Sequence, residues 1–351
     1  MRFYLFISNF AANKHLFRMK LGVLLPHTKL YGGVKRFLEL GNIFIEKGHE
    51  FCVYTPDGKA PDWFAYKGRM ATFEELGQEE TLDALFTTTV SYVPMLLQSG
   101  ARHKIFYHVR IREKLKEIMK NREIEIYACS TNVYRHNLSH FGRESFLAVG
   151  GVTVRNYQTK TNYSVPADRP FVVMGYGRLA ESVKGTKYVV KACEQLYKQG
   201  YNIKLLLFDT ALNEAWQKLL DSFTCQCPFE FVKNHPFDRN SELFNRADCF
   251  VSAENPRYSG WNNTVAEAMA CALPVVSTKA GTADLIVDDE TGIRSARWVF
   301  CFKRHIARLY HDEQLRQRLG TAARKHIGNY DWELVAQRIL DHLEEDSKPN
   351  N

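Results

Sequence analysis

Apolar and polar positions alternate along the first half of the chain in two repeating forms. Short apolar runs rich in β-branched and aromatic residues predict buried strands, and the amphipathic stretches between them predict helices. The predicted strands are 21–25, 51–54, 82–86, 104–108, 124–129 and 146–149, and the predicted helices are 33–47, 111–120 and 131–141. This order is typical of a parallel sheet covered by helices on both faces.

The same alternation restarts after residues 153–168, where periodicity is lost and Asn, Thr and Pro gather as in a linker. The predicted strands are then 171–174, 204–208, 229–232, 249–251 and 275–277, and the predicted helices are 186–197, 212–221, 240–247 and 264–272. A last helix, 331–345, has an apolar stripe that lets it pack on another element. We therefore predict an α/β protein with two Rossmann-like domains.

The predicted boundaries follow from these patterns. They are an N-terminal extension at 1–18, a first domain at 19–165, a second domain at 166–328, and a C-terminal helix at 329–351 that we expect to cross back onto the first domain. A chain of 351 residues is long enough for two ordinary domains.

Composition narrows the functional class. The chain is 45% hydrophobic and 25% charged, which excludes disordered and fibrous proteins, and no apolar run is long enough for a membrane span. Its net charge of +8 suits an enzyme that handles phosphates, or contact with an anionic surface, and we predict no nucleic-acid partner because no basic tract or binding signature accompanies it. A weak peripheral membrane contact, through 1–18 or the basic stretch 102–122, is left open.

The cysteines and the candidate metal ligands are interpreted as structural. Eight cysteines lie mostly inside apolar strand or helix patterns, which favours reduced thiols and a cytoplasmic location. His136 and His140 are four residues apart on a predicted helix but lack a third ligand, so we predict no metal site.

The most informative stretch is 251–276, where a short strand runs through an irregular loop into a helix. In an open parallel sheet such a loop faces the ligand crevice, and the unpaired N–H groups of the helix start bind anions. Thr264 and Glu267 have the spacing of a capping box, which needs no ligand; alternatively, the Glu267 carboxylate accepts hydrogen bonds from sugar hydroxyls.

Two further loops follow predicted strands. Gly32 and Gly33 open a helix, and paired glycines allow close backbone approach to a phosphate, although a tight turn is the better explanation of this motif taken alone. After strand 171–174, Arg178 and Lys184 flank a loop and both could converge on one diphosphate.

That loop also contains a G-x-G-x-x-A pattern at residues 175–180. We interpret the dinucleotide fingerprint as accidental, because the next helix starts near Gly185 and the nearest acid at a strand end, Asp209, is 34 residues beyond Gly175 instead of about 20.

Together these stretches resemble the retaining, nucleotide-sugar-dependent glycosyltransferases of the GT-B fold, the glycosyl transferase group 1 family. The resemblance runs from about Met19 to the C-terminal helix and rests on four motifs in the family order. They are Gly32-Gly33, Gly177-Arg178 with Lys184-Gly185, the run 244–248, and the run 267–276. It implies two domains that face each other across a cleft.

The resemblance also implies roles for individual residues. Arg178 and Lys184 would neutralise the donor diphosphate, Glu267 would hold the ribose, and His108 falls where the family places a histidine beside the transferred sugar, although a structural strand-end histidine is about as good an explanation. The remaining donor-binding candidates are Gly32, Gly33, Lys233, Ser259, Gly260, Trp261, Asn262, Asn263 and Thr264. Ser259 is a departure, because the family often has a glutamate eight residues before Glu267.

The hypothesis is a retaining, metal-independent hexosyltransferase that needs no cofactor beyond its donor. The donor would be a nucleoside diphosphate sugar of the GDP-mannose or UDP-glucose type, and the acceptor a hydroxyl of a glycan, lipid or protein-linked group. We expect the first-domain segments around Tyr31, 61–66 and 91–97 to select the acceptor. A nucleotide-sugar epimerase of the same fold and a non-catalytic nucleotide-sugar-binding module are the alternatives, and a dehydrogenase is the weakest.

Overall fold

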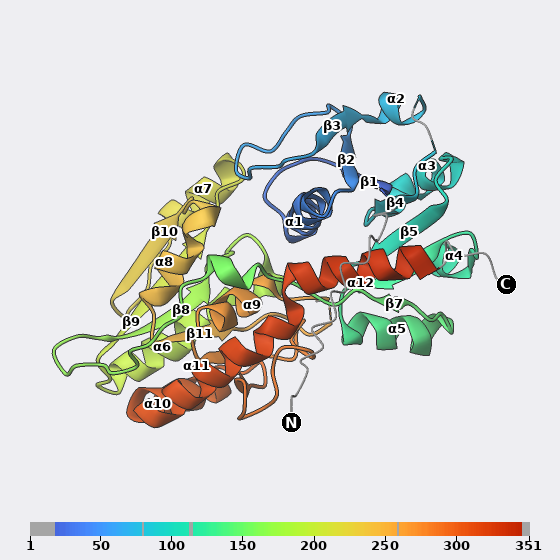
Figure 1. Cartoon of the computed structure of the whole chain (residues 1–351). Coiled ribbons are helices and arrows are strands. Elements are labelled where there is room, and N and C mark those ends of the chain that lie inside the picture. The colour runs from blue at the N-terminus through green and yellow to red at the C-terminus, as the bar shows by residue number, and fades with distance from the viewer. Residues whose placement is uncertain (1–17, 79–80, 112–114, 258–259, 346–351) are drawn as a thin grey trace, which may run out of the picture.

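The computed structural model describes residues 18–78, 81–111, 115–257 and 260–345, which form two α/β domains (Figure 1). The first contains a seven-stranded parallel sheet in the order β3-β2-β1-β4-β5-β6-β7. Its strands are β1 (Lys20–Leu24), β2 (Glu50–Thr55), β3 (Arg69–Thr72), β4 (Ala84–Thr87), β5 (His103–His108), β6 (Glu125–Ala128) and β7 (Phe146–Leu147). Its helices are α1 (Gly32–Glu46), α2 (Phe73–Leu76), α3 (Val93–Gln98), α4 (Lys116–Lys120) and α5 (Thr131–Phe141).

The second domain repeats the design with a six-stranded parallel sheet in the order β10-β9-β8-β11-β12-β13. The strands are β8 (Phe171–Tyr176), β9 (Ile203–Asp209), β10 (Phe229–Lys233), β11 (Cys249–Ser252), β12 (Val275–Ser277) and β13 (Ile293–Arg294). The helices are α6 (Thr186–Lys198), α7 (Glu214–Asp221), α8 (Asn240–Asn245), α9 (Asn263–Ala270), α10 (Val299–His311) and α11 (Glu313–Ile327). The predicted pair of parallel-sheet domains is confirmed.

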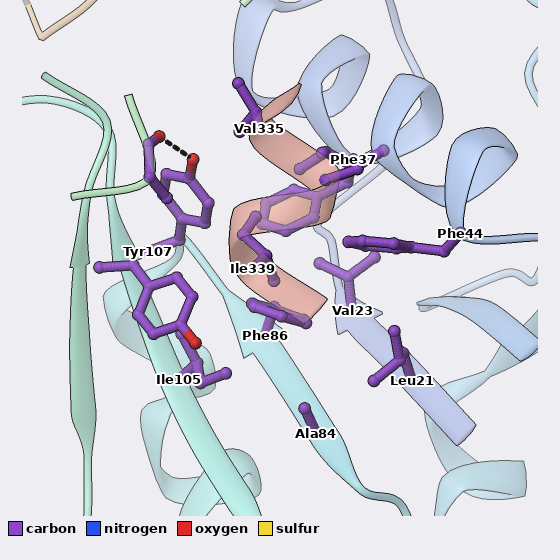
Figure 2. Packing of buried hydrophobic residues seen from close by; sticks show 14 of the residues in the cluster. Leu21, Val23, Phe37, Phe44, Ala84, Phe86, Ile105, Tyr107, Val335 and Ile339 are labelled. Atoms are coloured by element: carbon purple, nitrogen blue, oxygen red, sulfur yellow. Dashed lines mark hydrogen bonds between the residues drawn. The ribbon is translucent and has the colours of Figure 1, made fainter. Parts of the chain in front are cut away.

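The last helix, α12 (Trp332–Glu345), leaves the second domain and packs on α1 of the first, as predicted (Figure 1). Its apolar stripe, including Val335 and Ile339, enters the same buried cluster as Phe37 of α1 and Phe86 of β4 (Figure 2). A shared core of this kind gains free energy from apolar burial on both sides, so the two domains are joined by packing as well as by the linker.

The pattern missed several elements. Strand β3 and helices α2 and α3 are short and carry few fully buried residues, so their apolar periodicity is weak. Helices α10 and α11 were also missed, although they are long and amphipathic. The helix predicted at 111–120 begins only at Lys116, and residues 112–114 lie outside the described chain.

Two further predictions concern the N-terminal extension and membrane-spanning segments. Of the predicted N-terminal extension, residues 1–17 lie outside the described chain. Within the ranges that the structure describes, no helix combines the length and the apolar character that crossing a membrane requires.

Candidate functional site

The start of α9 is capped by its own loop. The Asn262 side chain accepts a hydrogen bond from the Val265 backbone N–H at 3.2 Å and another from the Thr264 hydroxyl at 3.0 Å. The capping box predicted from Thr264 and Glu267 is therefore wrong. Because Asn262 already serves as the cap, the Glu267 carboxylate points elsewhere.

A cavity of about 120 Å³ lies beside this helix start, where the two domains meet. Its walls come from the loop after β1, the ends of β8 and β9, and helices α8 and α9. The lining residues are Leu30, Tyr31, Gly32, Lys35, Tyr176, Arg178, Phe208, Asp209, Thr210, His235, Phe237, Asn240, Asn263, Thr264 and Glu267. Five of the predicted site residues are thus brought together here, namely Gly32, Arg178, Asn263, Thr264 and Glu267.

Arg178 is a buried cation that the second domain holds firmly. Its Nε donates to both carboxylate oxygens of Asp209, at 2.8 and 3.0 Å, while its terminal nitrogens reach Glu181 and the Tyr176 hydroxyl. Burial raises the pKa of Asp209 and the guanidinium opposes that rise. Since β8 and β9 are paired neighbours, the geometry of this pair is set by the sheet.

Lys184 lies near the same loop but does not line the cavity. Its Nζ is 3.1 Å from both carboxylate oxygens of Glu254, and Glu254 also accepts from the Asn262 side chain at 3.3 Å. Glu254 therefore joins Lys184 to the start of α9. This engagement makes Glu254 a poor replacement for the glutamate that the family often has at position 259.

The first domain contributes a cation that the motif analysis did not single out. Lys35, on the first turn of α1, donates from Nζ to Glu267 Oε1 at 2.7 Å, and both side chains are less than 10% exposed. The same ammonium lies 3.9 Å from the centre of the Phe237 ring. Asn240 approaches the other Glu267 oxygen at 3.5 Å. A buried ion pair thus joins α1 to α9 across the domain boundary.

Gly32 is needed for the close approach of the domains. A Cβ at this position would lie 2.6 Å from the Asn263 side-chain nitrogen, whereas a Cβ at Gly33 would meet nothing closer than 4.0 Å. Gly260 is more strictly constrained, because its Cβ would lie 2.1 Å from the backbone carbonyl oxygen of Val109 in the first domain. The glycines therefore bring backbone from both domains to the start of α9.

Other predicted residues lie apart from the cavity. Both ring nitrogens of the buried His108 have partners, the Asn137 side chain at 2.7 Å and the Arg110 carbonyl at 2.8 Å, which fits the structural interpretation. Lys233 pairs with Asp221 on the surface, and the Trp261 ring packs on Tyr330. Ser259 lies outside the described residues.

A second and larger cavity, of about 910 Å³, shares Phe237 with the first. It is lined by α1, the loop at residues 62–65, the linker and the start of α8. Trp63 and Phe237 meet edge to face at 5.8 Å, so this loop touches the second domain. Residues 62–65 fall within a segment that the sequence analysis expects to select the acceptor.

Comparison with known proteins identifies the second domain. Residues 158–326 match the family model of the glycosyl transferases group 1. The capsular polysaccharide biosynthesis glycosyltransferase CapM of Staphylococcus aureus is 27% identical over 207 residues, which cover 58% of this chain and 53% of CapM. The D-inositol 3-phosphate glycosyltransferase of Arthrobacter sp. (strain FB24) is 30% identical over 196 residues, 52% of this chain and 44% of the relative. The chain thus spans about half the length of these curated relatives.

Solved structures resemble the whole chain at low identity. Sucrose-phosphate synthase from Thermosynechococcus elongatus has a TM-score of 0.75 at 16% identity and covers 94% of this chain and 99% of its own. HepE of Anabaena, in complex with UDP and glucose, has a TM-score of 0.72 at 16% identity, and the match covers 93% of this chain and 100% of the HepE chain. These likenesses establish the fold. Residues 158–326 thus resemble the glycosyl transferases group 1, and the chain as a whole has the two Rossmann-like domains of the GT-B fold.

Proposed function

We propose that the protein transfers a hexose from a nucleoside diphosphate sugar to a hydroxyl acceptor, with retention of the anomeric configuration. The observation that carries this proposal is the cavity at the start of α9, where Arg178 and the backbone of the helix start come from one domain and Lys35 from the other. Positive groups fixed at this point would stabilise the negative charge that develops on a leaving diphosphate.

The pairing of the carboxylates supports a same-face reaction without a protein nucleophile. Asp209 and Glu267, the two carboxylates that line the cavity, are bonded to Arg178 and Lys35. In the proposed step the bond between the sugar C1 and the phosphate oxygen breaks, a bond from C1 to the acceptor oxygen forms, and the acceptor proton passes to the released phosphate oxygen.

We further propose that Glu267 binds the ribose of the donor. Its Oε1 accepts from Lys35 and its Oε2 lies 3.5 Å from the Asn240 side-chain nitrogen, and a carboxylate oxygen can accept a further hydrogen bond from a ribose hydroxyl. HepE, a protein of the same fold, has been solved with UDP-glucose, which makes this sugar nucleotide the first donor to test. GDP-mannose is the second.

The larger cavity is the proposed acceptor side. Its mixture of aromatic rings, such as Trp63 and Tyr157, with carboxylates and amides, such as Glu39 and Asn42, is suited to stacking on sugar rings and accepting hydroxyl hydrogens. A glycan or the glycan part of a glycolipid fits this chemistry.

We propose that catalysis needs no metal, because Arg178 and Lys35 would neutralise the diphosphate in place of a metal ion. Turnover should then be unchanged when a chelator is added to the assay. A cytoplasmic location is also proposed, since the eight cysteines are all free thiols.

The function is tested by measuring nucleoside diphosphate release from UDP-glucose and GDP-mannose, with and without glycan acceptors. A Lys184→Ala variant should lose about 10²-fold in turnover, because Lys184 is a preorganised cation next to the donor loop. Wild-type turnover in this variant would show that Lys184 does not contact the donor diphosphate, whereas no nucleoside diphosphate release by the wild type from either donor would contradict the assignment. An altered sugar without transfer would favour an epimerase, and binding without any turnover would favour a non-catalytic module.

A further inference from the structure

Two exposed aromatic side chains stand at the start of α10, away from both cavities. The side chain of Trp298 is 70% exposed and that of Phe300 is 63% exposed, the two largest values among the exposed large apolar residues of the described chain. Exposing rings of this size to water is unfavourable, so a surface that carries two of them within three residues is a candidate for binding a partner.

Basic residues lie on α10 and on its neighbour α6. The two helices pack against each other, and their sequences contain six Lys or Arg residues, of which Arg308 is paired with Asp289, and one acid, Glu194. Lys187, Lys191 and Arg304 are exposed, and Lys303 reaches over the Phe300 ring at 5.8 Å. Phe300 and Arg304 are four residues apart and share one face of α10. We call this surface, made of Lys187, Lys191, Trp298, Phe300, Lys303 and Arg304, the α10 patch.

We infer that the α10 patch binds the surface of an anionic lipid bilayer. Aromatic rings at the headgroup level and basic side chains beside them are the combination by which peripheral proteins attach to such membranes. The cores of protein–protein interfaces are depleted of lysine, which argues against a protein partner. The patch lies on two helices, α6 and α10, that pack against each other.

The patch is connected to the loops beside the candidate site. Arg297, next to Trp298, donates to the Ala253 carbonyl at 2.7 Å and to the Ser182 and Val183 carbonyls at 3.0 and 3.1 Å. These carbonyls flank Glu254 and Lys184. A bilayer that contacts Trp298 would therefore lie close to the rim of the cleft. The sequence analysis had placed membrane contact elsewhere, in 1–18 or 102–122.

The inference is tested by sedimenting the full chain with vesicles of phosphatidylcholine alone and of phosphatidylcholine mixed equally with phosphatidylglycerol. We expect binding to the mixed vesicles only, and weaker binding as salt is raised. The variant Trp298→Ala/Phe300→Ala should lose most of the binding. Lys187→Glu/Arg304→Glu should lose at least about fivefold for each charge. Lys120→Glu/Lys325→Glu changes the net charge by the same amount on other exposed helix positions and should bind nearly as well as the wild type.

Several results would overturn the inference. The first is no binding of the wild-type chain to anionic vesicles. The second is binding of the two patch variants as strong as that of the wild type, and the third is loss of binding in the control variant alone. Self-association or retention of single-stranded RNA that depends on the patch, without vesicle binding, would assign it to another partner. Thermal unfolding of each variant shows that it is folded. No sugar nucleotide is present in this experiment, so its outcome does not depend on the proposed transferase activity.

Discussion

Two buried ion pairs line the same cavity, but the chain assembles them differently. Arg178 and Asp209 follow neighbouring strands of one sheet, so their pairing is set as soon as that sheet forms. Lys35 and Glu267 come from helices of different domains and are 232 residues apart in the sequence. The first pair is therefore a fixed part of the second domain, whereas the second pair exists only while the domains are closed. A ligand that opens or closes the cleft acts on the second pair alone.

The largest effect is expected from removing one partner of the interdomain pair. A Lys35→Met change leaves the Glu267 carboxylate buried without its cation, which costs roughly 3–5 kcal/mol if the domains stay closed. The measurement is the free energy of unfolding from urea titration. The matched control, Lys35→Met/Glu267→Met, removes both charges and should recover most of the loss. Equal destabilisation in the single and double variants would show that the pair does not couple the domains.

Removing the fixed cation tests the other side of the comparison. Arg178→Ala should lower kcat for the donor by about 10²-fold or more, because a preorganised charge next to the diphosphate is lost. Arg308→Ala, which removes a half-exposed arginine paired with Asp289, is the control and should keep full activity. If the two variants have the same kcat, Arg178 is only a structural partner of Asp209.

The sequence analysis predicted the cation of the fixed pair, Arg178, but not the cation of the interdomain pair, Lys35. Arg178 could be found because it follows a predicted strand, and the order of strands and helices specified both sheets. Lys35 follows Gly32 and Gly33 closely in the sequence but was given no role, although a lysine one turn into a helix that starts with two glycines was a usable signal. Its partner could not be found, because no local pattern specifies which helix of the other domain it will meet.

The helix cap shows the same limit on a smaller scale. Thr264 and Glu267 have the spacing of a capping box, but Asn262 is an equally good cap two residues earlier. The choice between them is made by tertiary contacts of Asn262 with Ser252 and Glu254, which draw the loop into place. Spacing alone cannot decide between two caps that local chemistry permits.

A smaller effect is expected where backbone closes the cleft. Gly32→Ala places a Cβ against the Asn263 side chain, and overpacking of this kind costs about 1–3 kcal/mol. Here the cost destabilises the closed arrangement of the two domains. We expect a higher KM for the donor with little change in global stability. Gly33→Ala is the matched control, because its Cβ has open space. A Gly32→Ala enzyme with the KM of the Gly33→Ala enzyme would show that this contact does not limit closure.

The smallest effect concerns a pair that, like Arg178 and Asp209, is fixed by neighbouring strands. Glu125 of β6 lies 2.7 Å from His103 of β5, far from the domain boundary. Burial raises the pKa of Glu125, but hydrogen bonds from His103 and His342 outweigh it and lower the pKa from 4.5 to about 2. Because the folded-state pKa is depressed, the stabilisation is fully present above pH 4.5 and is lost as the pH falls from 4.5 towards 2.

The difference in unfolding free energy between wild type and Glu125→Gln isolates this carboxylate from all others that titrate in acid. At neutral pH it should be about 1–2 kcal/mol in favour of the wild type, less than the pKa shift alone implies because Glu125 is partly exposed and screened by solvent. It should shrink towards zero as the pH approaches 2. The same difference should appear in the Lys35→Met background, since a pair set by adjacent strands does not depend on domain closure. A difference in unfolding free energy that is constant with pH would contradict the role of the Glu125 carboxylate. A difference that disappears in the Lys35→Met background would contradict the distinction between fixed and closing pairs.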